Sequence, residues 1–179
     1  MGEYQNNKIG ILGGSFDPAH AGHLAISKIA IKKEKLRKIY WVITKKNPFK
    51  KKPFFSLKRR LQVAKKIVKK NNKIQVLYLD DIIKSSRSID AVKYIYRKKS
   101  SNLYFIIGSD ILYQFHRWKS WKRIVKLAKL IVFSRKGYDK KNKEFIVVKY
   151  LNKNKLTFIK NKPIEISSTI LRKKMGNSN

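Results

Sequence analysis

The stretch GGSFDPAHAGH (residues 13–23) decides the fold, because it joins an apolar run to a segment with helical spacing. The apolar run is Ile9–Leu12, which has the length of a buried strand. A strand that enters a glycine turn and then a helix is typical of phosphate sites in α/β proteins, where the first helical N–H groups point at the anion. His20 and His23, two of the three histidines in the chain, can add donors where charge builds during phosphoryl transfer.

The stretch fails the tests for two familiar phosphate motifs. It lacks the Gly-Lys-Ser/Thr ending of a P-loop and the glycine spacing of a dinucleotide fingerprint. Metal binding by His20 and His23 is one alternative, but the chain has no cysteine and offers no acidic partner at helical spacing. A structural turn with incidental histidines is the other alternative. We expect no metal site built from protein ligands.

Short apolar runs alternate with helical patterns along the rest of the chain. Further strands are expected at 39–43, 74–79, 103–107 and 130–133, and helices at 57–68, 89–96 and 121–128. This alternation predicts the α/β class, with a Rossmann-like, doubly wound, mostly parallel sheet and helices on both faces. We expect residues 1–179 to form a single domain, with ligands at the carboxyl ends of the strands.

The patterns of local structure are shorter toward the end of the chain. Segments 144–151 and 156–159 have the composition of short strands. Ser167, Ser168 and Thr169 are typical of a helix N-cap and precede a final short helix that includes Arg172. Earlier in the chain, Ser88 is expected to be the N-cap of its helix.

The chain of 179 residues is strongly basic, with 45 Lys and Arg, 10 Asp and Glu, and a formal net charge of +35. Such a charge attracts polyanions. Only nine of the basic residues are arginine, and the lysines are scattered with much Ile and Asn, which favours compositional drift over a dedicated nucleic-acid surface. We therefore expect no specific nucleic-acid partner, and a non-catalytic nucleic-acid-binding protein is the alternative from another functional class.

The composition also bears on location. Residues 1–7 are polar and lack a signal-peptide core, and no apolar run approaches the roughly 18 residues of a membrane span. We expect a soluble, cytoplasmic protein without a membrane partner, and an oligomer is compatible with the sequence.

Two motifs at opposite ends of the chain give a specific resemblance. The segment His20–His23 resembles the His-x-Gly-His signature of the nucleotidylyltransferase superfamily. The segment Ser167–Arg172, which reads Ser-Ser-Thr-Ile-Leu-Arg, resembles its second signature, Ser-Ser-Thr-x-x-Arg. Within the superfamily, the chain resembles the bacterial nicotinate-nucleotide adenylyltransferases along nearly its whole length. The intermediate matches are Asn47–Lys50, Arg60–Leu61, Ser86–Asp90, Phe105–Asp110 followed by Trp118, and Phe133–Gly137.

The resemblance implies that ATP and nicotinate mononucleotide give nicotinate adenine dinucleotide and pyrophosphate. It implies catalytic roles for His23, at the α-phosphate, and His20, which positions the triphosphate. The expected ATP-binding residues are these two histidines with Gly13, Gly14, Ser15, Phe16, Gly108, Asp110, Ser167, Ser168 and Arg172. The expected residues for the acceptor are Lys50, Ser86, Ser88, Trp118 and Arg135. Mg²⁺ is expected to be carried by the phosphates of ATP.

The sequence leaves more than one acceptor substrate open. Nicotinamide mononucleotide and phosphopantetheine, used by other members of the superfamily, are the alternatives. Arg87 and Ser88 replace a tyrosine and a threonine of the family's Ser-Tyr-Thr-Val-Asp segment, and the loop around Lys50 is richer in lysine than usual. These departures concern contacts to the pyridine end of the acceptor.

Overall fold

Six parallel strands form one sheet in the part of the chain that the computed structural model describes. That part comprises residues 7–46, 52–99, 102–135, 137–138, 145–151, 153–161, 168–169 and 171–172. The strands are β1 (Lys8–Gly14), β2 (Lys38–Ile43), β3 (Ile74–Leu77), β4 (Asn102–Gly108), β5 (Ala128–Phe133) and β6 (Leu156–Ile159). Their order is β3-β2-β1-β4-β5-β6, so the winding reverses between β1 and β4. Sheets of this kind bind ligands at that reversal, beyond the carboxyl ends of the strands.

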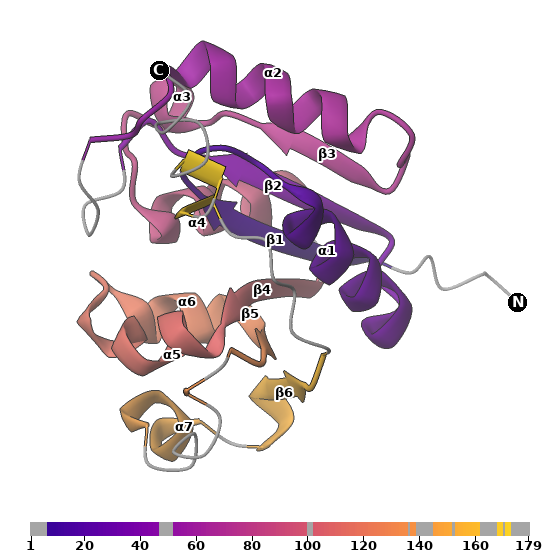
Figure 1. The fold of residues 1–179 in the computed structure, drawn as a ribbon. Helices are drawn as coiled ribbons and strands as arrows, with labels where there is room; N and C mark the ends of the chain where they lie inside the picture. Colours follow the sequence, from indigo (N-terminus) through magenta and orange to yellow (C-terminus); the bar gives the residue numbers. More distant parts are fainter. Residues whose placement is uncertain are drawn as a thin grey trace, which may run out of the picture.

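Helices cover both faces of the sheet (Figure 1). One core contains the apolar residues of α1 (Ala21–Glu34) and α2 (Leu57–Val68). The other contains those of α4 (Ser88–Lys99), α5 (Ser109–Gln114), α6 (Trp121–Leu127) and α7 (Ile146–Tyr150). Three short helical segments complete these elements: α3 (Asp80–Ile83), η1 (Phe115–Arg117) and η3 (Lys153–Lys155). The doubly wound α/β fold predicted from the sequence is therefore confirmed. Among the described residues, no helix has both the length and the apolarity needed to span a membrane.

Three local predictions were wrong. Segment 146–150 is helix α7 and not a strand, because Phe145 and Val147 are buried in the core beside α5 and this packing outweighs the strand preference of Ile and Val. Ala128 begins β5 and does not end α6. Ser88 is the first helical residue and not the N-cap, since the Arg87 carbonyl accepts the first turn's N–H groups.

The last described residues of the chain lie beside the loop that follows β1. Figure 1 shows the turn that contains residues 168–172, in yellow, beside the carboxyl end of β1, in indigo. The backbone of Leu171 and Arg172 is helical, as the sequence predicts, and Ser168 and Thr169, which were expected to cap this helix, are helical too. This proximity brings the two signature motifs to the same edge of the sheet.

Candidate active site

His20 and His23 form a reciprocal cap at the start of α1. His20 is the N-cap, and its Nδ1 accepts a hydrogen bond from the N–H of Gly22 at 3.1 Å. The Nδ1 of His23 accepts from the N–H of His20 at 3.2 Å. This is the capping-box geometry, with imidazoles in place of Ser and Glu. Because a ring nitrogen that accepts a hydrogen bond carries no proton, each neutral ring has its proton on Nε2, which is then a donor at the positive end of the helix.

His20 is uncharged at neutral pH. Only 8% of its surface is exposed, and burial, together with the positive charge of Arg135, lowers the pKa of His20 to about 4. A neutral imidazole in this position donates a hydrogen bond without adding a charge. The ring centroids of His20 and His23 lie 3.9 Å apart, so the two imidazole rings are in direct contact.

The aromatic rings of Phe16 and Trp41 pack against the ring of His23. Its ring lies 4.7 Å from that of Phe16, which stacks at 5.1 Å on Trp41 from β2. Trp41 Nε1 donates to Ser27 Oγ at 2.8 Å, and Ser27 Oγ donates to the carbonyl of His23 at 2.8 Å. The ring and the backbone of His23 are therefore both fixed by the sheet.

The turn before α1 differs from the glycine turn that the sequence predicts. Gly13 and Gly14 are the last residues of β1, and neither has a positive φ. The residue in the left-handed region is Phe16, with φ of 47°. Burial of the Phe16 side chain in the core of the α1 face accounts for this conformation in a residue other than glycine.

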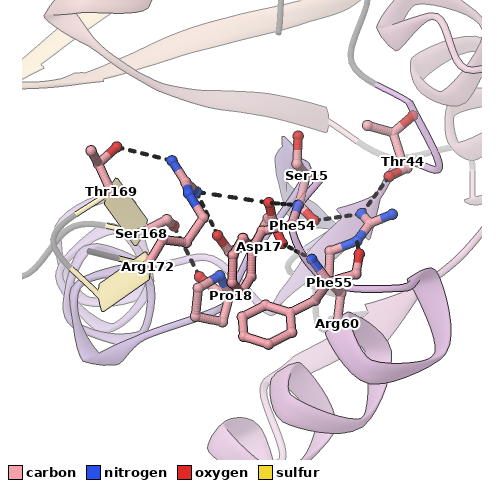
Figure 2. Close-up of polar contacts among 10 residues, drawn as sticks. All are labelled: Ser15, Asp17, Pro18, Thr44, Phe54, Phe55, Arg60, Ser168, Thr169 and Arg172. Atoms are coloured by element: carbon pink, nitrogen blue, oxygen red, sulfur yellow. Dashed lines mark hydrogen bonds and ion pairs between the residues drawn. The ribbon is translucent and has the colours of Figure 1, made fainter. Parts of the chain in front are cut away.

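The buried side chain of Arg60 joins three segments of the site. Arg60 was identified from the sequence only as a motif match, and its backbone contacts were not predicted. Arg60 is 2% exposed, and its guanidinium donates to the carbonyls of Ser15 at 2.7 Å, Thr44 at 2.8 Å and Phe55 at 3.2 Å (Figure 2). It also donates to the carbonyl of Lys45 at 3.1 Å. Burial lowers the pKa of Arg60 from its usual value of 12.5. The loop before α1, the end of β2 and the entry to α2 are thereby held together.

The second signature contacts the loop before the first signature, mainly at Asp17. Arg172 Nη1 donates to the Asp17 carbonyl at 2.6 Å and lies 3.8 Å from the Asp17 carboxylate, and Arg172 Nη2 donates to Thr169 Oγ1 at 3.1 Å. Ser168 Oγ donates to the Pro18 carbonyl at 2.9 Å (Figure 2). The sequence predicted Arg172 and Ser168 as site residues and missed Asp17, which carries no distinguishing signal beyond its place in the motif. Ser167 lies outside the described residues.

The end of β4 forms the opposite side of the site. Ser109 Oγ accepts from the backbone N–H of Arg135 at 2.8 Å, and Arg135 Nε lies 3.9 Å from Asp110 Oδ1. A Cβ on Gly108 would meet the Asp110 carboxylate, so a larger residue there would require the Asp110 side chain to move. Arg135 also acts on His20 through its charge, which links this side of the site to the histidines.

The residues expected to bind the acceptor are more dispersed. Trp118 is half-buried and packs against Phe115 at 5.1 Å and Phe105 at 6.3 Å, in the core of the α4–α7 face. Ser86 is exposed, and Ser88 begins α4. Lys50 lies outside the described residues.

Two acidic residues after β3 have separate roles. Asp80 Oδ2 accepts from Thr44 Oγ1 at 2.9 Å and from the N–H of Lys45 at 2.8 Å, so Asp80 fixes the end of β2. Asp81 accepts from the hydroxyl of Tyr78 at 2.8 Å. Burial and this hydrogen bond raise the pKa of Tyr78 to about 12. Within the described part of the chain, no three His, Cys, Asp or Glu side chains gather in a way that could hold a metal ion.

Comparison with known proteins agrees with this geometry. The cytidylyltransferase-like family matches residues 11–174. A probable nicotinate-nucleotide adenylyltransferase of Pelagibacter ubique is 47% identical over 169 residues, which cover 94% of each chain. One from Aquifex aeolicus is 34% identical over 164 residues, covering 89% of this chain and 98% of the relative.

Solved structures share the fold. The nicotinic acid mononucleotide adenylyltransferase of Plasmodium falciparum, complexed with NaAD, superposes with a TM-score of 0.74 at 22% identity. The superposition covers 93% of this chain and 83% of that one.

Proposed function

Because the chain belongs to the cytidylyltransferase-like family and, within it, to the nicotinate-nucleotide adenylyltransferases, we propose that it transfers the adenylyl group of ATP to nicotinate mononucleotide. The products are nicotinate adenine dinucleotide and pyrophosphate. The observation that carries the proposal is the contact between Arg172 and Asp17, since it joins the second signature to the loop that leads into the helix start where both imidazoles lie. Residues 1–179 then act as one catalytic domain.

In this reaction the protein has to align the substrates and does not have to activate the nucleophile. An oxygen of the mononucleotide phosphate attacks the α-phosphorus of ATP, and the bond from that phosphorus to the bridging oxygen of pyrophosphate breaks. The attacking phosphate is already an anion at neutral pH, so neither a general base nor a covalent intermediate is required. The protein must hold attacking and leaving oxygens in line and stabilise charge on the non-bridging oxygens.

In this proposal His23 donates from Nε2 to the α-phosphate, and His20 positions the triphosphate. Their shared cap supports this assignment, because both Nδ1 atoms accept from backbone N–H groups and each ring therefore carries its proton on Nε2. Gly13, Gly14, Ser15 and Phe16 supply backbone close to the nucleotide. Gly108 and Asp110 contact the adenosine, while Ser167, Ser168 and Arg172 hold the β- and γ-phosphates.

Mg²⁺ would enter on the triphosphate. Both Asp17 and Asp110 lie beside arginines, so these two carboxylates are poor ligands for a metal ion held by the protein itself. When bound, Mg²⁺ neutralises charge on the phosphates of ATP.

For the acceptor we propose Lys50, Ser86, Ser88, Trp118 and Arg135. Trp118 suits a planar ring, because its indole is half-buried at the edge of an aromatic cluster. The two cationic side chains suit the phosphate and the carboxylate of nicotinate mononucleotide. The basic surface of the molecule would favour the approach of both anionic substrates.

A panel of acceptors tests the proposed function. The protein is incubated with ATP and Mg²⁺ and, separately, with nicotinate mononucleotide, nicotinamide mononucleotide or phosphopantetheine, and pyrophosphate release is followed. We expect the highest kcat/KM with nicotinate mononucleotide. A higher kcat/KM with either other acceptor would reassign the substrate, and no release with any of them would refute adenylyl transfer.

A further inference from the structure

Asp17 is a carboxylate in the middle of a candidate phosphate site, with only 7% of its surface exposed. A negative charge there repels the phosphates of a nucleotide. Burial of an ionised carboxylate is also costly unless cations and N–H donors surround it. The contacts of Asp17 therefore indicate what this side chain does for the site.

These contacts join two segments that are far apart in the sequence. Oδ2 accepts from the N–H of Phe54 at 2.7 Å and Oδ1 from that of Phe55 at 2.9 Å, at the entry to α2. On the other side, the carboxylate lies 3.8 Å from Arg172 Nη1, which also donates to the Asp17 carbonyl (Figure 2). The carboxylate thus accepts from two backbone N–H groups on one side and faces the guanidinium on the other.

The orientation of Arg172 follows from these anchors. A guanidinium is a planar fork of five N–H donors. The Asp17 carbonyl accepts from Nη1, the Asp17 carboxylate lies 3.8 Å from the same nitrogen, and Thr169 Oγ1 accepts from Nη2, so the plane of the guanidinium is fixed from two sides. The loop that carries Asp17 reaches His20 three residues later, and the same short loop therefore sets the place of the guanidinium relative to the imidazoles.

We propose that Asp17 is a positioning residue for ATP: it orients Arg172 relative to His20 and His23 and does not itself contact the reacting atoms. This inference rests on the proposed function, in which Arg172 holds the β- and γ-phosphates. The competing explanation is structural, namely that Asp17 only ties Phe54 and Phe55 to the loop.

A double-mutant cycle separates the two explanations. Asp17→Asn and Arg172→Ala are made singly and together, and the Kd for a non-hydrolysable ATP analogue with Mg²⁺ is measured for each. If Asp17 acts through Arg172, Asp17→Asn weakens binding about tenfold in the wild-type background and less than about twofold in the Arg172→Ala background. An equal weakening in both backgrounds, or none in either, would overturn the proposal.

Asp80→Asn is the matched control. Asp80 also accepts from a backbone N–H at the end of a strand, but its partners are Thr44 and Lys45. We expect any effect of Asp80→Asn on the Kd to be the same in both backgrounds. If it too disappears in the Arg172→Ala background, the coupling is not specific to Asp17 and the proposal is wrong.

A second variant keeps the test available should Asp17→Asn fail to fold. Arg172→Lys retains the charge, but a single ammonium cannot replace the fork that spans Asp17 and Thr169. We expect about tenfold weaker binding of the analogue, and wild-type affinity would overturn the proposal. Because these readouts are binding constants, failure of adenylyl transfer by the wild type would refute the function separately. Normal transfer with independent effects of the variants would refute only the positioning role.

Discussion

His20 and His23 combine two tasks in the same side chains. Their Nδ1 atoms cap α1, and the tautomer that this cap selects leaves Nε2–H groups as donors at the positive end of the helix. The position of both histidines was predictable from the motif. Their tautomers were not, because they depend on the backbone N–H groups of Gly22 and His20 itself.

Replacing His23 by Gln separates the two tasks. Glutamine at this capping position can still accept from the N–H of His20, while the imidazole donor is lost. We expect kcat to fall by about 100-fold or more, which is the scale for losing one preorganised donor. The thermal unfolding midpoint, measured beside kcat, should change little. Turnover near that of the wild type would contradict the role of His23.

The buried His20 makes the stability of the protein depend on pH. Its pKa is about 4 in the folded protein and near 6.5 when unfolded, so between these values the unfolded chain binds more protons. The free energy of unfolding should therefore fall as the pH drops from 6.5 to 4, by up to about 3 kcal/mol from this residue.

Urea unfolding of the wild type and His20→Asn, at several pH values, measures this contribution. Asparagine is a good N-cap and does not titrate, so it is the matched control for the cap. Between pH 6.5 and pH 4 the wild type should lose more unfolding free energy than His20→Asn. The stability of the variant relative to the wild type should therefore increase as the pH falls. A difference that stays constant with pH would contradict a depressed pKa of His20.

At the scale of elements, the sequence was most informative where apolar runs and helical spacing were clear. The strands around Ile11, Trp41 and Phe105 and helix α2 were all predicted. Segment 146–150 was not, because its burial against α5 decides its conformation and only the folded structure shows that packing. The clamp made by Arg60 was also hidden, since its partners are backbone carbonyls, which have no sequence signature.

Arg60→Met tests the clamp between the elements. The substitution leaves four carbonyls without their shared donor in a buried place, and we expect the free energy of unfolding to fall by about 3–5 kcal/mol. Its neighbour Arg59 is exposed, so Arg59→Met should change stability by no more than about 0.5 kcal/mol. Urea denaturation compares the two variants, and similar stabilities would contradict a structural role for Arg60.

Two glycines of β1 offer a matched pair. A Cβ on Gly10 would lie 2.8 Å from Ile39 Cγ1, whereas a Cβ on Gly13 would come no closer than 3.9 Å to Phe105. Gly10→Ala should therefore destabilise the fold by about 1–3 kcal/mol. Gly13→Ala should leave stability within about 0.5 kcal/mol of the wild type and raise the KM for ATP about tenfold, because the methyl group meets the nucleotide. An unchanged KM would contradict close approach of the nucleotide to Gly13.

At the scale of the whole molecule, charge is distributed unevenly. Among the described residues, five of the six carboxylates lie beyond the carboxyl ends of β1, β3 and β4, where they bind loops or arginines, and Glu34 is the exception. Three of these groups, Asp17, Asp80 and Asp110, contact segments of the candidate site, while Asp81 and Asp90 bind within their own loops. Composition alone predicted the net charge but not this placement, which depends on the order of the strands.

Residues of the two motif regions meet beyond the carboxyl end of β1, and the identity of the reaction products tests most directly whether they form one transfer site. Wild-type protein is incubated with ATP, Mg²⁺ and nicotinate mononucleotide, and the products are identified by mass spectrometry. We predict nicotinate adenine dinucleotide and pyrophosphate in equal amounts, with both lost together in His23→Gln and sharply reduced in Arg172→Ala. Absence of the dinucleotide with the wild type, or undiminished formation in both variants, would contradict a transfer site built from Gly13–His23 and Ser168–Arg172.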